Sequence, residues 1–204
     1  MTGLLRRRVL HGTLATVAFA LIGCAAAPAA PAPESATRSA SVSFPLINLG
    51  FESAKRQTGG DPEGWLSFQH AGDVSYRFTL DANEKKSGQQ SLRIDNTGIE
   101  PYGVLQQFVN AVPHGGKIAR LSGWIKTKDA SDHGAGLTIN VSRSGYSVGQ
   151  NYMADAPIKG TTNWTRYEIT VPVPAGASRV EVGVMLRGKG SVWFDDAELE
   201  FITP

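Results

Sequence analysis

The sequence predicts an all-β domain, built as a two-sheet jelly-roll sandwich. Two observations support this fold class. Short runs in which apolar and polar residues alternate recur along the chain, and this is the pattern of strands that bury one face. Turn-forming residues separate the runs, and the chain contains 23 glycines and 11 prolines. Many short strands without helical spacing favour a sandwich or a jelly roll.

The clearest strand lies near the C-terminus, where Val180, Val182, Val184 and Leu186 occupy alternate positions. Turn signals at 58–62, 113–116 and 174–176 delimit further runs. We expect about eight strands of this kind, in the ranges 74–80, 91–95, 104–109, 118–126, 137–142, 167–171, 180–187 and 191–202.

The N-terminus predicts export and attachment to lipid. Arg6–Arg8 precede an apolar run, and Leu21-Ile22-Gly23-Cys24 has the form of a bacterial lipobox, in which the cysteine is acylated. We expect residues 1–23 to be a signal peptide that is removed. The alternative is an ordinary signal peptide that contains a cysteine by chance.

Residues 24–43 are rich in Ala, Pro and Ser, which predicts a disordered tether ahead of a folded domain at 44–204. The mature protein would then hang from a membrane of the bacterial envelope by lipid on Cys24. Ala25, where an aspartate would favour retention at the inner membrane, favours the outer membrane. The sequence leaves open which face of that membrane carries the domain.

Charge and cysteine content exclude several classes of function. The formal net charge is +2, and part of it lies in Arg6–Arg8, so the mature domain is close to neutral and nucleic acid is not an expected partner. Cys24 is the only cysteine, which rules out an internal disulfide or a cysteine-based metal site.

One motif resembles a catalytic one. Residues 145–149 read Gly-Tyr-Ser-Val-Gly, which fits the nucleophile elbow of hydrolases. The elbow needs a helix after the serine and a histidine later in the chain, but the last histidine is His133, ahead of Ser147. The sequence therefore predicts a protein that is not an enzyme, with a Gly/Ser loop at this position.

A buried carboxylate is expected in the last strand. Alternation places Asp195 and Trp193 on the same side as Ala197 and Phe201. An inward carboxylate must be paired or must bind a cation. Glu52 lies at the start of the domain, and the first and last strands of a jelly roll commonly adjoin, so the two acids could form a structural Ca²⁺ site. The alternative is hydrogen bonding to backbone amides at a sheet end.

Polar and aromatic residues in loops, or at the polar phase of strands, are candidates for a ligand-binding face. Trp124 and Trp164 are expected to be structural. A hydrated outer sheet is the alternative interpretation of the candidate face. Its residues are Tyr102, Gln106, Asn140, Arg143, Tyr146 and Tyr152.

An ordered set of short motifs spans the mature domain: 48–52 (Asn-Leu-Gly-Phe-Glu), 64–65 (Gly-Trp), 87–92, 121–124 (Leu-Ser-Gly-Trp), Trp164, and 193–196 (Trp-Phe-Asp-Asp). The set resembles the jelly-roll carbohydrate-binding modules of the family 4/9 type, within the galactose-binding-like sandwiches. The resemblance implies a structural Ca²⁺ held by the N-terminal Glu and a closing Asp, here Glu52 and Asp195. The C-terminal half also resembles accessory domains that precede secreted processing-type serine peptidases.

Together these observations predict a lipid-anchored, non-catalytic envelope module that binds a glycan. The alternative is a protein-interaction or scaffolding lipoprotein of the envelope. The sequence leaves the ligand, the protein partner and the oligomeric state open.

Overall fold

The computed structural model describes residues 46–53 and 61–204, which are almost entirely β-structure. The one helical element in this part is a single 3₁₀ turn, Val112–His114. No helix in the described ranges has the length and apolar character needed to cross a membrane. The predicted all-β class is confirmed.

Nine antiparallel strands make up the described fold, and most lie close to the predicted ranges. The first and the sixth strand lie outside the predicted ranges. The strands are β1 (Leu66–Gln69), β2 (Tyr76–Asp81), β3 (Ser91–Asn96), β4 (Tyr102–Asn110), β5 (Ile118–Arg143), β6 (Tyr146–Asn151), β7 (Ile158–Pro172), β8 (Arg179–Arg187) and β9 (Ser191–Ile202).

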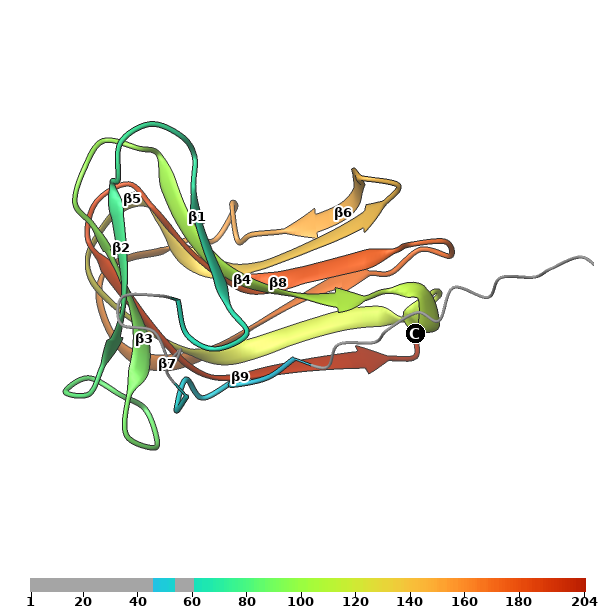
Figure 1. The fold of residues 1–204 in the computed structure, drawn as a ribbon, viewed down its shortest axis with the longest axis horizontal. Coiled ribbons are helices and arrows are strands. Elements are labelled where there is room, and N and C mark those ends of the chain that lie inside the picture. The colour runs from blue at the N-terminus through green and yellow to red at the C-terminus, as the bar shows by residue number, and fades with distance from the viewer. Residues whose placement is uncertain (1–45, 54–60) are drawn as a thin grey trace, which may run out of the picture. The chain divides into compact units, whose positions relative to one another are not determined.

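The strands form two layers that share β5 (Figure 1). Residues 118–128 of β5 pair with β9, and residues 135–142 pair with β8. The upper sheet therefore has the order β1-β4-β8-β5-β6, and the lower sheet has the order β2-β3-β9-β5-β7. This is the expected two-layer sandwich, closed on one side by the bend in β5.

The structure has the single strand β5 where the sequence pattern predicts two strands, 118–126 and 137–142. The backbone turns without breaking because Asp129 and Gly134 take positive φ angles, 53° and 62°. The pairing of β5 with β7 is irregular over the same stretch, as at a β-bulge. The polar residues between the two expected strands therefore bend a single strand.

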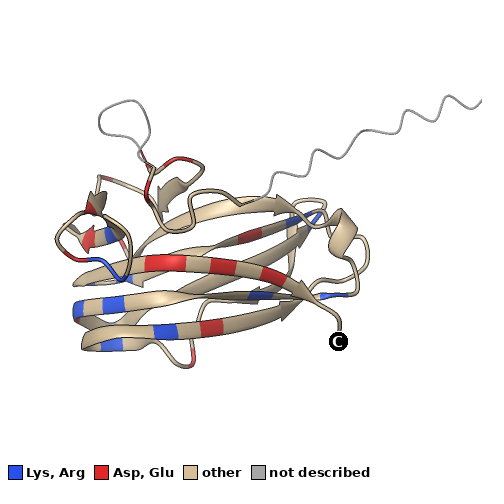
Figure 2. Ribbon diagram, turned by 90° about the horizontal axis from the view of Figure 1, so that it is seen from below, with Lys and Arg blue, Asp and Glu red and all other residues tan. Residues whose placement is uncertain are grey.

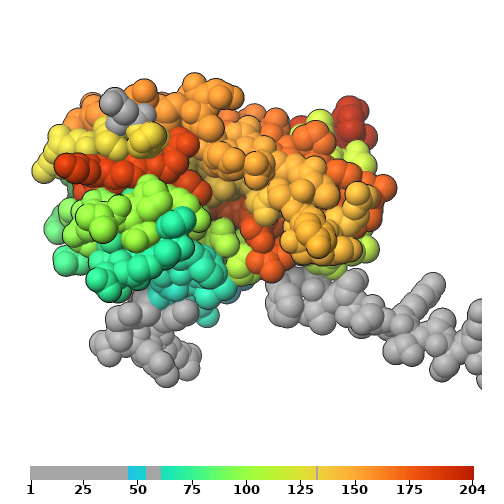
Figure 3. All heavy atoms as spheres, turned by 90° about the horizontal axis from the view of Figure 1, so that it is seen from above, coloured from blue at the N-terminus to red at the C-terminus, as the bar shows by residue number. Residues whose placement is uncertain are grey.

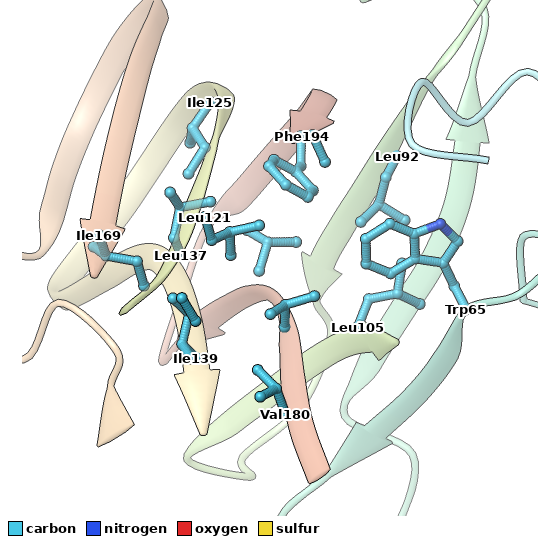
Figure 4. Close-up of a cluster of buried hydrophobic side chains, with 14 of the residues drawn as sticks. Trp65, Leu92, Leu105, Leu121, Ile125, Leu137, Ile139, Ile169, Val180 and Phe194 are labelled. Atoms are coloured by element: carbon cyan, nitrogen blue, oxygen red, sulfur yellow. The ribbon is translucent and has the colours of Figure 1, made fainter. Parts of the chain in front are cut away.

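The core lies between the two sheets (Figure 4). The alternate residues of β8, from Val180 to Leu186, are fully buried and confirm the predicted inward face. At one end of the core the rings of Phe51, Trp65 and Phe194 form an aromatic cluster, with centroids 5.0 to 6.3 Å apart. The Trp65 indole N–H donates to the Asn48 carbonyl oxygen, so this cluster also fixes the first described segment.

The face predicted for Trp193 and Asp195 is wrong, because β9 contains a bulge. Its register against β5 shifts by one residue between Ser122 and Trp124, and Asp196 has a φ of 48°. Val192 and Phe194 enter the core before the bulge, and Ala197 enters it afterwards. Trp193 and Asp195 therefore lie on the outer face of the lower sheet.

Burial nevertheless holds for both residues, because other groups cover them. The Arg93 guanidinium lies 4.9 Å from the Trp193 ring centroid.

Trp124 and Trp164 do not belong to the core: both are partly exposed, and the Lys86 ammonium lies over the Trp124 ring. These two tryptophans are expected to be structural, and that expectation stays a prediction.

Candidate functional site

The outer face of the upper sheet, hereafter the upper face, is where most predicted ligand residues gather. Figure 3 views it with β6 on one side, β1 and β4 on the other, and β8 between them. Side chains opposite in phase to the core residues form it. From β4, β8, β5 and β6 these are Tyr102, Val104, Gln106, Phe108, Glu181, Gly183, Met185, Arg187, Thr138, Asn140 and Gln150.

Gly183 forms the floor of the upper face. It pairs with Gln106 on β4 and with Thr138 on β5. A Cβ at this position would overlap the carbonyl oxygen of Leu105, so β8 can approach β4 this closely only with glycine. The β4 backbone fills the place of a side chain here, and polar residues, Gln106 and Thr138, lie on both sides of Gly183.

A row of hydrogen bonds fixes the polar groups beside this floor. Asn140 Nδ2 donates to Glu181 Oε2 at 3.1 Å, and Ser147 Oγ donates to Asn140 Oδ1 at 2.6 Å. Arg179 forms an ion pair with Glu181 at 2.7 Å and lies over the Phe108 ring, 3.9 Å from its centroid. These groups are held in place before any ligand arrives, which lowers the entropy lost on binding.

The rim of the upper face is formed by the segment that ends β6. Gln150 Nε2 donates to the Tyr152 hydroxyl at 3.0 Å. A cavity of about 320 Å³ opens beside this pair and is also lined by Asn151, Ala154 and Asp155. On the opposite edge Phe68 of β1 is 44% exposed.

The structure brings four of the six predicted ligand residues together. Gln106, Asn140 and Tyr102 lie on the upper face, and Tyr152 lies at its rim. Arg143 and Tyr146 pair with each other at the far tip of the β5–β6 hairpin, where Tyr146 is 78% exposed. They lie apart from the other four.

Sequence reasoning missed Phe68, Phe108, Glu181 and Arg187 as residues of this face. The signal for two of them was present, because Glu181 and Arg187 occupy the outward phase of the clearest strand pattern. Phe68 gave no signal of this kind, since β1 has four residues and was not predicted.

The outer face of the lower sheet has a different character (Figure 2). Its acidic residues on β9 pair with basic residues on β5 and β7: Glu200 with Arg120, and Glu198 with Arg166 at 2.7 Å. Lys126 also pairs with Glu84, beside a cavity of about 370 Å³. Charges that already neutralise each other are less available to a ligand.

The Gly-Tyr-Ser-Val-Gly motif has no catalytic geometry. Ser144 and Gly145 form the two-residue turn of the β5–β6 hairpin, both with positive φ, and Ser147 lies in the second strand. A nucleophile elbow joins a strand to a helix, whereas this turn joins two strands. The expected loop is thus a hairpin.

Glu52 and Asp195 converge on one loop between β2 and β3. Asp195 Oδ2 accepts the backbone N–H groups of Lys86 and Ser87 at 2.9 and 3.1 Å. Both Glu52 carboxylate oxygens lie within 3.1 Å of the Gln89 backbone nitrogen, which donates to them. We call these two carboxylates the loop latch.

Asp195 is fully buried, and this burial raises the pKa of its carboxyl above the ordinary value. The backbone N–H groups of Ser87, Lys86 and Asp196 lower this pKa, without cancelling the effect of burial.

The carboxylates of the loop latch accept hydrogen bonds from backbone N–H groups, which is the environment of a satisfied acid and not of a cation site. Ca²⁺ takes carboxylates together with carbonyl oxygens, whereas the loop turns N–H groups toward both acids. Among the described residues, no group of three or more His, Cys, Asp or Glu side chains could hold a metal. The contacts of Glu52 and Asp195 fit the alternative interpretation, in which the carboxylates bond to backbone amides. Ca²⁺ binding stays a prediction.

Comparison with known proteins shows the fold. No family model matches the chain. Over 144 residues it is 35% identical to the uncharacterized HTH-type transcriptional regulator YbfP of Bacillus subtilis (strain 168). The match covers 68% of this chain and 48% of the regulator, so the chain spans about half the length of this curated relative.

Two solved structures have the same architecture. A cyclase from Fischerella sp. TAU has a TM-score of 0.54 at 16% identity, over 80% of this chain and 100% of the cyclase. The CBM22-1 xylan-binding domain from Paenibacillus barcinonensis Xyn10C has a TM-score of 0.54 at 15% identity, over 76% and 92% of the two chains. The chain thus has a jelly-roll fold that is found both in a carbohydrate-binding module and in a cyclase.

Proposed function

We propose that the domain is a non-catalytic module that binds a glycan across the upper face. The observation that carries the proposal is the fixed polar row of Asn140, Glu181 and Ser147 beside the Gly183 floor. A sugar offers hydroxyl groups, which need oriented donors and acceptors, and an apolar ring face, which packs on aromatic side chains. Phe68 and Tyr152 border the floor and supply such surfaces.

The xylan-binding domain supports this proposal through its shared fold, and the cyclase supports an enzymatic alternative to the same degree. Chemistry on the upper face favours binding. Ser147 is the candidate nucleophile of the Gly-Tyr-Ser-Val-Gly motif. Its hydroxyl donates to an amide oxygen, and no basic group is among its described contacts. A serine needs an adjacent base to act as a nucleophile.

The proposal includes the lipid anchor. Cys24 and the tether lie outside the described residues, and the sequence pattern alone supports them. The module would then present its upper face to a glycan of the cell envelope or its surroundings, from a position fixed to a membrane, with the outer membrane favoured.

Binding to immobilised polysaccharides tests the function. The compact unit of residues 40–204 should be retained by at least one cell-wall or plant polymer. Asn140→Ala should weaken retention by about tenfold, since a hydrogen bond to a ligand contributes about 1 to 2 kcal/mol. Thr170→Ala, an exposed change on the lower sheet, is the matched control. Equal retention of the two variants would contradict the assignment of the upper face.

A second candidate, docking to a protein, has one observation in its favour. Val74 and Ile99 are 82% and 96% exposed, and Ser75 joins their loops through hydrogen bonds to Thr97 and Ile99. Two neighbouring exposed aliphatic side chains suit a protein contact. If an envelope protein binds, Val74→Ser with Ile99→Ser should abolish that binding, while Asn140→Ala should leave it unchanged.

A further inference from the structure

Arg187 is a partly buried cation without a counter-ion among the described residues. It lies on the upper face at the end of β8. Its one described side-chain hydrogen bond is a long one, from Nη2 to the Met153 carbonyl oxygen at 3.4 Å. Burial lowers the pKa of the Arg187 guanidinium, although arginine remains protonated at any physiological pH.

The other arginines of the described sheets show how unusual this is. Four arginines of the described residues have a carboxylate oxygen within 3.5 Å: Arg93, Arg120, Arg166 and Arg179. Arg77 and Arg143 lie in exposed positions where water solvates the charge. A guanidinium that is partly removed from water and lacks an acid is expensive unless a ligand supplies one.

The surroundings of Arg187 direct it toward the site. It pairs across the sheet with Tyr102, and the rim segment that contains Tyr152 and Met153 lies beside it. Along β8 it stands in the same outward row as Gly183 and Glu181. Four residues of extended strand separate Arg187 from the floor, which is about 13 Å at 3.3 Å per residue.

The two ends of this row differ in charge. Glu181 is neutralised by Arg179, so that end offers polar contacts without net charge. Arg187 leaves the other end positive. A ligand that crosses the floor would therefore meet hydrogen-bonding groups first and a free cation at its far end.

We propose that the ligand of the upper face is an acidic glycan, and that Arg187 pairs with the carboxylate of a uronic acid residue in it. This inference rests on the proposed function. A guanidinium presents two parallel N–H groups that match both oxygens of a carboxylate, which gives direction as well as attraction.

The experiment compares one polymer in two forms. Affinity electrophoresis of residues 40–204 is run with polygalacturonate and with the same polymer after its carboxyl groups are reduced to alcohols. The acidic form should bind at least tenfold more tightly. Arg187→Gln should lose that preference and bind both forms equally, while Arg187→Lys should keep part of it as a point charge. Alginate and glucuronoxylan are run alongside, since the backbone sugar is open.

Two controls separate the possible results. Arg77→Gln removes an equal charge from an exposed site on β2 and should change nothing. Dextran sulfate tests general attraction to a polyanion: binding to it as tight as to the uronate polymers, and unaffected by Arg187→Gln, would overturn the proposal. Thermal unfolding of each variant shows that it is folded.

The outcome also distinguishes this inference from the proposed function. If neutral polymers bind as well as acidic ones, and Asn140→Ala weakens both while Arg187→Gln weakens neither, the acidic ligand class is wrong and glycan binding stands. If no acidic or neutral polymer binds at all, both proposals fail.

Discussion

Replacement of Asp195 tests how the loop between β2 and β3 is held to the sandwich. In the native protein the buried carboxylate accepts N–H groups from Lys86 and Ser87. Asp195→Ala leaves both donors without an acceptor. Asp195→Asn is the matched change, because it keeps the shape and one acceptor oxygen but removes the charge.

The size of the effect follows from the two lost hydrogen bonds. A buried donor left unsatisfied costs about 1 to 3 kcal/mol, so Asp195→Ala should lower the free energy of unfolding by roughly 2 to 6 kcal/mol. For a domain of this size each kcal/mol shifts the melting temperature by about 2 to 4 °C. We expect a decrease of roughly 10 °C for Asp195→Ala and a smaller one for Asp195→Asn.

The pH dependence of stability shows which force dominates at Asp195. Burial raises its pKa in the folded state above the ordinary value of 3.8, so the folded protein holds this proton more tightly than the unfolded chain does. The resulting stabilisation is fully present below pH 3.8 and is lost as the pH rises through the folded-state pKa. Relative to Asp195→Asn, the wild type should therefore become less stable as the pH rises above 3.8 and through the folded-state pKa.

Urea unfolding of the wild type and of both variants across this pH range measures the effect. A wild type that gains stability over Asp195→Asn as the pH rises would refute the dominance of burial. Chelator is added in a parallel series, since bound Ca²⁺ would also favour the ionised form. If chelator lowers the melting temperature of the wild type but not of Asp195→Asn, the calcium prediction is supported; no change in the wild type would contradict it.

Three further changes have defined outcomes. Trp65→Ala should destabilise the domain by about 3 to 5 kcal/mol in urea unfolding, because it removes a fully buried ring from the aromatic cluster; a loss below about 1 kcal/mol would contradict that packing. Burial and the nearby Lys117 lower the pKa of His114 below 6.5 in the folded state, so stability should be lost as the pH falls from about 7 to 5, and an NMR titration midpoint above 6.5 would oppose this. Cys24→Ala should release the protein from the membrane fraction of cells, and continued membrane association would refute the lipid anchor.

The fold class followed from the sequence because a strand with one buried face leaves a period-2 pattern. That pattern is strongest in β8, whose inward residues, Val180 to Leu186, are all fully buried. The single strand β5 did not follow, since Asp129 and Gly134 are residues that serve a turn and a bend equally well. Local composition cannot distinguish the two, because the choice depends on which strands β5 meets.

The candidate site was harder to predict, because it depends on register. One extra residue in β9 moved Trp193 and Asp195 to the other face, and alternation cannot reveal where a bulge lies. Asn140 and Gln106 were placed on one face from their polar phase alone. The role of Arg187 could not be predicted from the sequence, since only the three-dimensional structure shows that no carboxylate among the described residues pairs with it.

The bend that carries β5 from one sheet to the other makes the two layers a single mechanical unit. Neither sheet can lose β5 without breaking the other, so the domain should unfold in one cooperative step. A ligand on the upper face would then stabilise the lower sheet as well, although it touches none of its residues. Any occupant of the site can therefore be found by the temperature at which the whole domain melts, before its chemical identity is known.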